Sequence, residues 1–150
     1  MTLFKEAADI KTSDQLNLPT PTPIYHNEVA QPTEIQKQMV QELSERAARV
    51  HAQLVDPSTD NMLKITSDGR KLGLDQRVIN PDLPDDPNSK VNRCVDNIHR
   101  IWQDGQTEKL TQLVFCDLST PHGDGSFNVY DDIRDKLVAS GIPKEEIQFI

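Results

Sequence analysis

The first half of the chain carries hydrophobic residues at helical spacing. Between residues 33 and 54 they recur every three or four positions, which predicts an amphipathic helix with one buried face; this stripe comprises Ile35, Met39, Leu43, Ala47, Val50 and Leu54. Thr33 is followed three residues later by Gln36, the spacing of a capping box, so the helix should begin there. Asp56-Pro57 should end it. A second helical stretch follows over residues 60–79, where the turn signal Asp68-Gly69 predicts two short helices instead of one.

Prolines mark both ends of this helical half. Pro19, Pro21 and Pro23 alternate with threonines and favour an extended path, followed by a short edge strand over residues 24–29. Residues 80–88 contain three prolines and three aspartates, which predicts a loop. The pattern therefore divides the chain into an extended, poorly ordered lead-in (1–31), a helical connector (32–80) and a third region (88–150).

The third region predicts alternating helices and strands. Ser89 should cap a helix that ends near Gly105, with an apolar face made by Val91, Val95, Ile98, Ile101 and Trp102. The continuous apolar run Leu113–Cys116 is typical of a strand buried on both faces. A helix with Val129, Ile133, Leu137 and Val138 should then end at Gly141, and residues 147–150 begin another strand. A helix-β-α-β order implies parallel strands joined by a right-handed crossover.

The predicted sheet is incomplete. Two parallel strands do not form a stable sheet, and the last one would leave an apolar edge uncovered at Ile150. Hydrophobic residues make up only 35% of the chain and aromatic residues 5%, which is low for an independent core. We therefore expect a piece cut from a larger domain, with self-association through the cut strand edge.

Charge, cysteine content and the lack of long apolar runs exclude several classes to which the protein could belong. A formal net charge of −8 repels phosphates, which excludes a generic nucleic-acid binder. Cys94 and Cys116 lack metal-ligand spacing and fit reduced core thiols. The first ten residues contain Lys5, Glu6 and Asp9 and do not resemble a signal peptide, and no apolar run reaches the length of a membrane helix. We expect a cytoplasmic protein without a membrane partner.

The loop after the first predicted strand, residues 117–126, is the main candidate for chemistry, because open α/β sheets bind ligands at the carboxyl ends of their strands. Gly123 and Gly125 suggest a phosphate-binding loop, but the lysine and spacing of a Walker loop are missing. Asp117 suggests a phosphatase nucleophile, although Ser119 stands where that class needs a second carboxylate. Ser119 and Thr120 suggest hydroxyl contacts to a nucleic-acid backbone, or alternatively they only close a turn.

The histidines and the basic residues of the 60–80 stretch are two further candidate groups. The four histidines are too scattered for a metal site. Residues 60–80 are mildly basic, with Lys64, Arg70, Lys71 and Arg77 against three aspartates. This stretch is interpreted either as a solvated helix face or as a DNA-facing patch.

Five segments together resemble a group of Snf-type superfamily-two DNA helicases from bacteria, phages and conjugative elements, some of them fused to adenine-specific DNA methylases. The resemblance covers nearly the whole chain and keeps the order of the segments: Asn61–Arg77, Asn88–Asn92, Thr111–Pro121, Phe127–Ile133 and Gly141–Ile147. It implies an α/β fold in which an incomplete RecA-like parallel-sheet unit (helix-β-α-β, the first half of the second motor domain, 88–150) follows a helical connector (32–80).

The resemblance also implies a function. The parent protein would be a DNA-dependent ATPase that uses ATP and Mg²⁺, and its partners would be DNA and the remaining motor domains of the same polypeptide. Ser119 and Thr120 would contact the DNA backbone, with Arg70 and Lys71 as secondary candidates. This chain has no Walker lysine loop, no Asp-Glu-x-His motif and no arginine-finger motif, so alone it should hold no cofactor and catalyse nothing. The alternative is a small phosphatase-like or ligand-binding α/β domain that uses Asp117.

Overall fold

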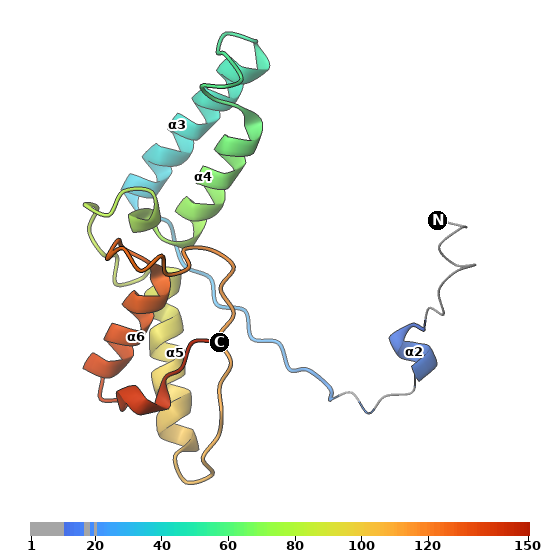
Figure 1. Ribbon diagram of the computed structural model, residues 1–150, viewed down its shortest axis with the longest axis vertical. Helices are drawn as coiled ribbons and strands as arrows, with labels where there is room; N and C mark the ends of the chain where they lie inside the picture. Colours follow the sequence, from blue (N-terminus) through green and yellow to red (C-terminus); the bar gives the residue numbers. More distant parts are fainter. Residues whose placement is uncertain (1–10, 17–18, 20) are drawn as a thin grey trace.

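All regular structure in the described part of the chain is helical. The computed structural model describes residues 11–16, 19 and 21–150 (Figure 1). Its elements are α2 (Ser13–Leu16), α3 (Glu34–His51), α4 (Met62–Leu74), the 3-10 helix η1 (Gln76–Val78), α5 (Lys90–Gly105), α6 (Val129–Ala139) and the 3-10 helix η2 (Lys144–Glu146). None of the described residues belongs to a β-strand. The prediction of an α/β, RecA-like parallel-sheet unit is therefore wrong.

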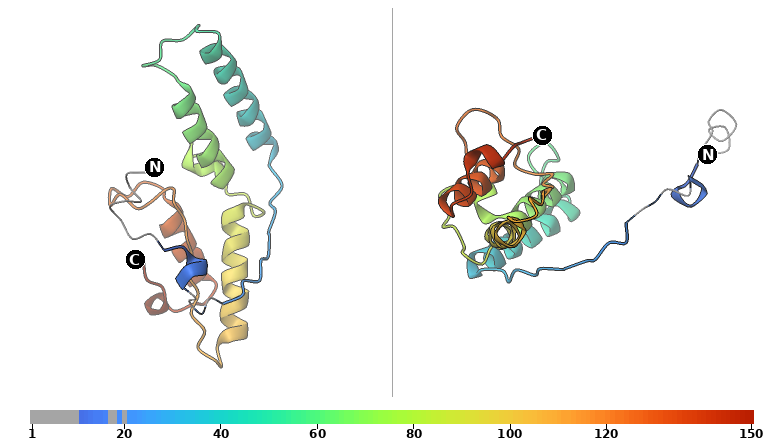
Figure 2. Two further views of the ribbon diagram at one scale, coloured as in Figure 1. Left: turned by 90° about the vertical axis from the view of Figure 1, so that its right-hand side faces the viewer. Right: turned by 90° about the horizontal axis from the view of Figure 1, so that it is seen from below.

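Helices α3 and α4 form an antiparallel hairpin that makes up one end of the molecule (Figures 1 and 2). The predicted capping box is confirmed: the Thr33 hydroxyl accepts the N–H of Gln36 at 3.0 Å, and the Gln36 amide oxygen accepts the N–H of Thr33 at 3.0 Å. The predicted break at Asp68-Gly69 is wrong, because α4 runs through it. Gly69 lies where α4 approaches Leu43 of α3, so there the glycine serves helix packing and makes no turn.

Helices α5 and α6 lie side by side at the other end of the molecule, after the predicted loop over residues 80–88, which is confirmed. Ser89 caps α5 as predicted, because its hydroxyl accepts the N–H of Asn92 at 3.1 Å. The core between the two helices is small: Val95, Leu137 and Ile142 are buried, and Ile98, Trp102, Ile133 and Ile147 pack around them.

The end of α6 is set by Gly141, as predicted. Gly141 has a φ of 104°, in the left-handed region that favours glycine. Its N–H donates to the carbonyl of Val138 at 3.0 Å, and the N–H of Ile142 donates to the carbonyl of Leu137 at 3.1 Å. This is a Schellman motif, and it turns Ile142 back onto Leu137 in the core.

The three predicted strands are not formed. Residues 24–29, 113–116 and 147–150 have no strand structure, and the apolar side chains of Ile24, Phe115 and Ile150 are exposed. Residues 111–117 run alongside α5, where the Gln112 side-chain amide donates to the carbonyl of Ile98 at 3.0 Å (Figure 1). A strand is stabilised by hydrogen bonds to a neighbouring strand, and no described segment lies beside these three to provide them.

The predicted lead-in is described only in part. Residues 1–10, 17, 18 and 20 lie outside the described residues. Residues 21–33 have no regular secondary structure; they run in from outside the helical body towards the start of α3 (Figure 1), and Glu28 lies 3.6 Å from Arg93 of α5.

Candidate functional site

Hydrogen bonds hold the beginning of the 117–126 loop against the first turn of α6. The Ser119 hydroxyl accepts the N–H of Val129, the first residue of α6, at 3.0 Å. The Tyr130 hydroxyl donates to the carbonyl of Cys116. Ser119 itself has a φ of 58°, so the chain reverses sharply there. The turn-closing role considered for Ser119 is therefore present in the structure.

The outer part of this loop is exposed to solvent. Gly123 and Gly125 both have positive φ values, and Asp124 accepts hydrogen bonds from the Ser126 hydroxyl at 2.6 Å and from its N–H at 2.9 Å. These two bonds lower the pKa of Asp124, so the carboxylate is charged at neutral pH. Thr120 is exposed, and its hydroxyl bonds to no described residue.

Arg70 of α4 approaches the same loop from the hairpin. Its guanidinium forms an ion pair with the carboxylate of Asp117, two residues before Ser119. The structure thus brings together candidates from two segments that lie 47 positions apart in the sequence. Lys71 is half-buried, and its ammonium pairs with no described residue.

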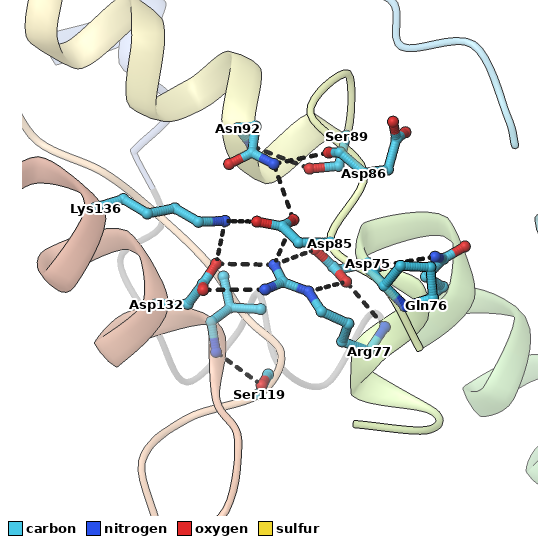
Figure 3. A network of polar contacts seen from close by, with 12 residues as sticks. Asp75, Gln76, Arg77, Asp85, Asp86, Ser89, Asn92, Ser119, Asp132 and Lys136 are labelled. Atoms are coloured by element: carbon cyan, nitrogen blue, oxygen red, sulfur yellow. Dashed lines mark hydrogen bonds and ion pairs between the residues drawn. The ribbon is translucent and has the colours of Figure 1, made fainter. Parts of the chain in front are cut away.

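Arg77 is the centre of a buried cluster that sequence reasoning missed (Figure 3). Its guanidinium contacts Asp75 through Nε–Oδ1 at 3.0 Å and Nη2–Oδ2 at 2.8 Å. It contacts Asp132 of α6 through Nη1–Oδ1 at 3.1 Å and Nη2–Oδ2 at 2.9 Å. Two bidentate pairs on one arginine use nearly all of its donors, which fixes the directions of both carboxylates.

Loop 80–88 completes what we call the Arg77 cluster: Asp75, Arg77, Asp85, Asp132 and Lys136. Asp85 lies 3.1 Å from Arg77 Nη2, and Lys136 Nζ lies 2.7 Å from Asp85 and 2.8 Å from Asp132. Asn92 of α5 holds the loop in place, since its amide donates to the Asp85 carboxylate at 2.9 Å and to the Asp86 carbonyl at 2.7 Å (Figure 3). The cluster thereby joins the end of the hairpin to α5 and α6.

The charges of this cluster are stabilised against burial. Burial raises the pKa of Asp132, but hydrogen bonds from Arg77 and Lys136 outweigh it and hold that pKa below its ordinary value. Burial lowers the pKa of Arg77, and the hydrogen bonds to Asp75 and Asp132 more than reverse this. The ring of Phe127 covers the guanidinium, 4.6 Å from its centroid. The cluster thus offers no free nucleophile or open anion site, and it acts by holding segments together.

Sequence reasoning assigned Arg77 to the basic stretch, but the side chain is buried and faces carboxylates. One signal could have found the cluster. Four of the five resembling segments contribute to it or to its neighbours: Arg77 from the first, Asn92 from the second, Ser119 from the third, and Asp132 from the fourth.

The described residues contain neither a cluster that could bind a metal ion nor a helix that could span a membrane. Over residues 11–16, 19 and 21–150, no group of three or more His, Cys, Asp or Glu residues could hold a metal ion. Within the same residues, no helix combines the length and the apolar character needed to cross a membrane. Comparison with protein-family models, with curated proteins and with solved structures returned no match.

Proposed function

We propose that this chain is the DNA-contacting, non-catalytic part of a DNA-dependent ATPase of the Snf-type helicase group, acting in the cytoplasm. The five segments that resemble this group support the proposal. The observation that carries it is the meeting of Arg70 with the 117–126 loop, because a cation from one segment and the exposed Thr120 hydroxyl from another are then available to one phosphate backbone, beside the half-buried Ser119.

Phosphate contact at this site would not depend on base sequence. Arg70 can pair with phosphate oxygens, and the exposed Thr120 hydroxyl can donate to them. The Ser119 oxygen accepts the Val129 N–H, but its own O–H remains able to donate. Asp117 competes with DNA for Arg70, so binding requires the phosphate to displace this carboxylate.

The nucleotide chemistry belongs to other parts of the proposed parent. ATP and Mg²⁺ would bind to the remaining motor domains of the same polypeptide, where the residues that handle the γ-phosphate would lie. The Arg77 cluster fixes α6, which follows the loop, to the hairpin that carries Arg70. DNA bound at the loop would therefore affect the position of both parts relative to the motor domains.

The phosphatase-like alternative has less support. The carboxylate of Asp117 faces the Arg70 guanidinium, and the residue two positions later is Ser119, where a second carboxylate is needed. Phosphatase turnover that survives purification and is lost in Asp117→Asn would favour this alternative.

DNA titration at low ionic strength tests the proposal. Fluorescence anisotropy with a labelled duplex should show weak, salt-dependent binding, because the chain carries a net charge of −8. Arg70→Ala should reduce the slope of log K against log salt by about 1, the value for one lost phosphate contact. Asp117→Asn should strengthen binding, because it frees Arg70.

Arg100→Ala is the matched control. Arg100 is 64% exposed and forms an ion pair with an exposed aspartate, as Arg70 does at 57%, but it lies on α5 away from the loop. Its loss should leave the slope unchanged. If both arginines change the slope equally, binding is a diffuse charge effect and the proposed site is wrong.

A further inference from the structure

The two cysteines of this chain lie on neighbouring segments. Cys94 belongs to α5, and Cys116 belongs to residues 111–117, which run back beside this helix (Figure 1). Both thiols are free and half-buried. Because the sequence contains no further cysteine, any disulfide within the chain has to join these two residues.

One side of the segment 111–117 faces α5. The chain reverses its direction after this helix, so the segment runs antiparallel to it (Figure 1). Gln112 and Cys116 are half-buried, whereas the other five residues of the segment are exposed. The Gln112 side-chain amide donates to the carbonyl of Ile98 in α5 at 3.0 Å. The half-buried residues therefore mark the side that faces the helix.

This arrangement carries Cys116 towards Cys94. Cys94 lies four residues before Ile98, one turn earlier on the same face of α5. Cys116 lies four residues after Gln112, on the same side of an extended chain. Because the helix and the segment run in opposite directions, both steps lead the same way. The extended step covers about 13 Å and the helical step about 6 Å, and the long Gln112 side chain with its hydrogen bond can span the difference.

The ionisation of Cys94 supports this closeness. Burial raises the pKa of the Cys94 thiol, and a thiolate at Cys116 raises that pKa further. The second effect requires the two sulfur atoms to be near each other, because the repulsion between like charges weakens with distance. The Cys116 thiol also donates to the carbonyl of Leu118 at 3.2 Å, a contact that a disulfide would replace.

We propose that Cys94 and Cys116 form a redox-responsive pair that hydrogen peroxide converts into an intramolecular disulfide. Peroxide oxidises the Cys116 thiol to a sulfenic acid and leaves as water, since burial suppresses the reactive thiolate of Cys94. The Cys94 sulfur then bonds to the Cys116 sulfur, and the sulfenic oxygen leaves as a second water. The two sulfurs lose the two electrons that cleave the O–O bond of the peroxide.

The disulfide would fix the start of the 117–126 loop to α5, because Cys116 directly precedes this loop. Thiol reductants would reverse the crosslink by exchange. Neither reaction requires DNA, so the pair can be tested independently of the proposed DNA contact.

Intact-mass spectrometry after peroxide treatment tests the disulfide. At low protein concentration, the native chain should lose the mass of two hydrogen atoms without forming dimers, and dithiothreitol should restore the mass. The matched control combines Cys116→Ser with Leu113→Cys, which keeps two cysteines but places the second at an exposed position of the segment. This control should crosslink at least about 10-fold more slowly in native buffer, because distant thiols cannot bond without backbone movement.

Unfolding should remove the difference between the two cysteine pairs. In concentrated urea they should crosslink at similar rates, because they close loops of nearly equal length. A native chain that keeps both thiols, or that stops at the sulfenic acid, would overturn the proposal. Equal rates for the two pairs in native buffer would also overturn it, since crosslinking would then reflect chain flexibility and not the placement of the thiols.

The Gln112 contact provides a second test. Gln112→Ala should slow disulfide formation in the native chain roughly 5-fold, the factor that corresponds to one hydrogen bond. Gln103→Ala is the control, because Gln103 is an exposed glutamine of α5. Circular dichroism verifies that both variants keep their helices. Equal rates in the two variants would contradict the role of this contact in bringing the thiols together.

Discussion

Two arginines form ion pairs that hold helices together, one within the α3–α4 hairpin and one between the hairpin and α6. They differ in how far they are exposed to solvent. Arg46 of α3 forms a bidentate pair with Asp60, at 2.8 and 2.9 Å, and a further bond to Asp68 of α4 at 2.9 Å. Arg77 forms two bidentate pairs. The Arg46 side chain is 33% exposed, whereas that of Arg77 is 9% exposed.

The difference lies in what each arginine joins. Arg46 connects two helices that are already neighbours in sequence and in space. Because its side chain is partly exposed, water can replace part of its contribution to the free energy of unfolding. Arg77 connects η1 to a residue of α6 that lies 55 positions away, with little access to water. A hairpin tolerates the loss of such a pair, whereas the joint between two halves with small cores should not.

The largest expected effect is on the Arg77 cluster. Arg77→Lys keeps the charge but cannot form two bidentate pairs, so it should lower the free energy of unfolding by about 2–4 kcal/mol. Arg46→Lys should cost only about 0.5–1 kcal/mol. Urea unfolding followed by circular dichroism measures both variants. Equal losses would show that burial does not distinguish the two clusters.

The second-largest expected effect is the weakening of the Arg77 cluster by acid. The pKa of Asp132 is lowered in the folded chain, so its stabilising contribution is complete above its unfolded value of about 3.9 and is lost as pH falls below that value. Urea midpoints measured between neutral pH and pH 3 should therefore fall steeply below about pH 4. Asp132→Asn should flatten this fall, whereas Asp135→Asn, at an exposed carboxylate of the same helix, should not.

The smallest effect concerns the two loop hydroxyls. Ser119→Ala removes the acceptor for the Val129 N–H and should cost about 0.5–1.5 kcal/mol of stability. Thr120→Ala should leave stability unchanged within about 0.5 kcal/mol, because its exposed hydroxyl bonds to no described residue, yet it should weaken DNA binding. Thermal unfolding together with the anisotropy titration separates these outcomes. Unchanged DNA binding in Thr120→Ala would leave Arg70 as the main contact.

Helix ends could be predicted from the sequence because their causes are local. Thr33 with Gln36, Ser89, and Gly141 each act through backbone groups within a few positions, so their spacing carries the information. The break at Asp68-Gly69 failed for a tertiary reason: Asp68 bonds to Arg46 and Gly69 accommodates Leu43, both on α3.

Strands and the buried cluster could not be predicted in the same way. The apolar run Leu113–Cys116 has the same sequence pattern whether it lies in a sheet or forms an exposed extended segment. The difference depends on whether another segment of the chain supplies hydrogen bonds to its backbone. The pairing of Arg77 with Asp132 joins residues whose separation follows no helical or strand period. Of the candidate site, Arg70 and Ser119 were identified by residue type, but their closeness was not.

Hydrogen exchange with DNA present tests the central claim most directly, namely that Arg70 and the 117–126 loop form one phosphate-contacting surface. Adding a short duplex at low ionic strength should slow amide exchange in the loop and at the start of α6, where Ser119 meets Val129. Exchange along α3, on the other helix of the hairpin, should not change. Slowed exchange in α3 without any change in the loop, or no change anywhere at saturating DNA, would contradict the account.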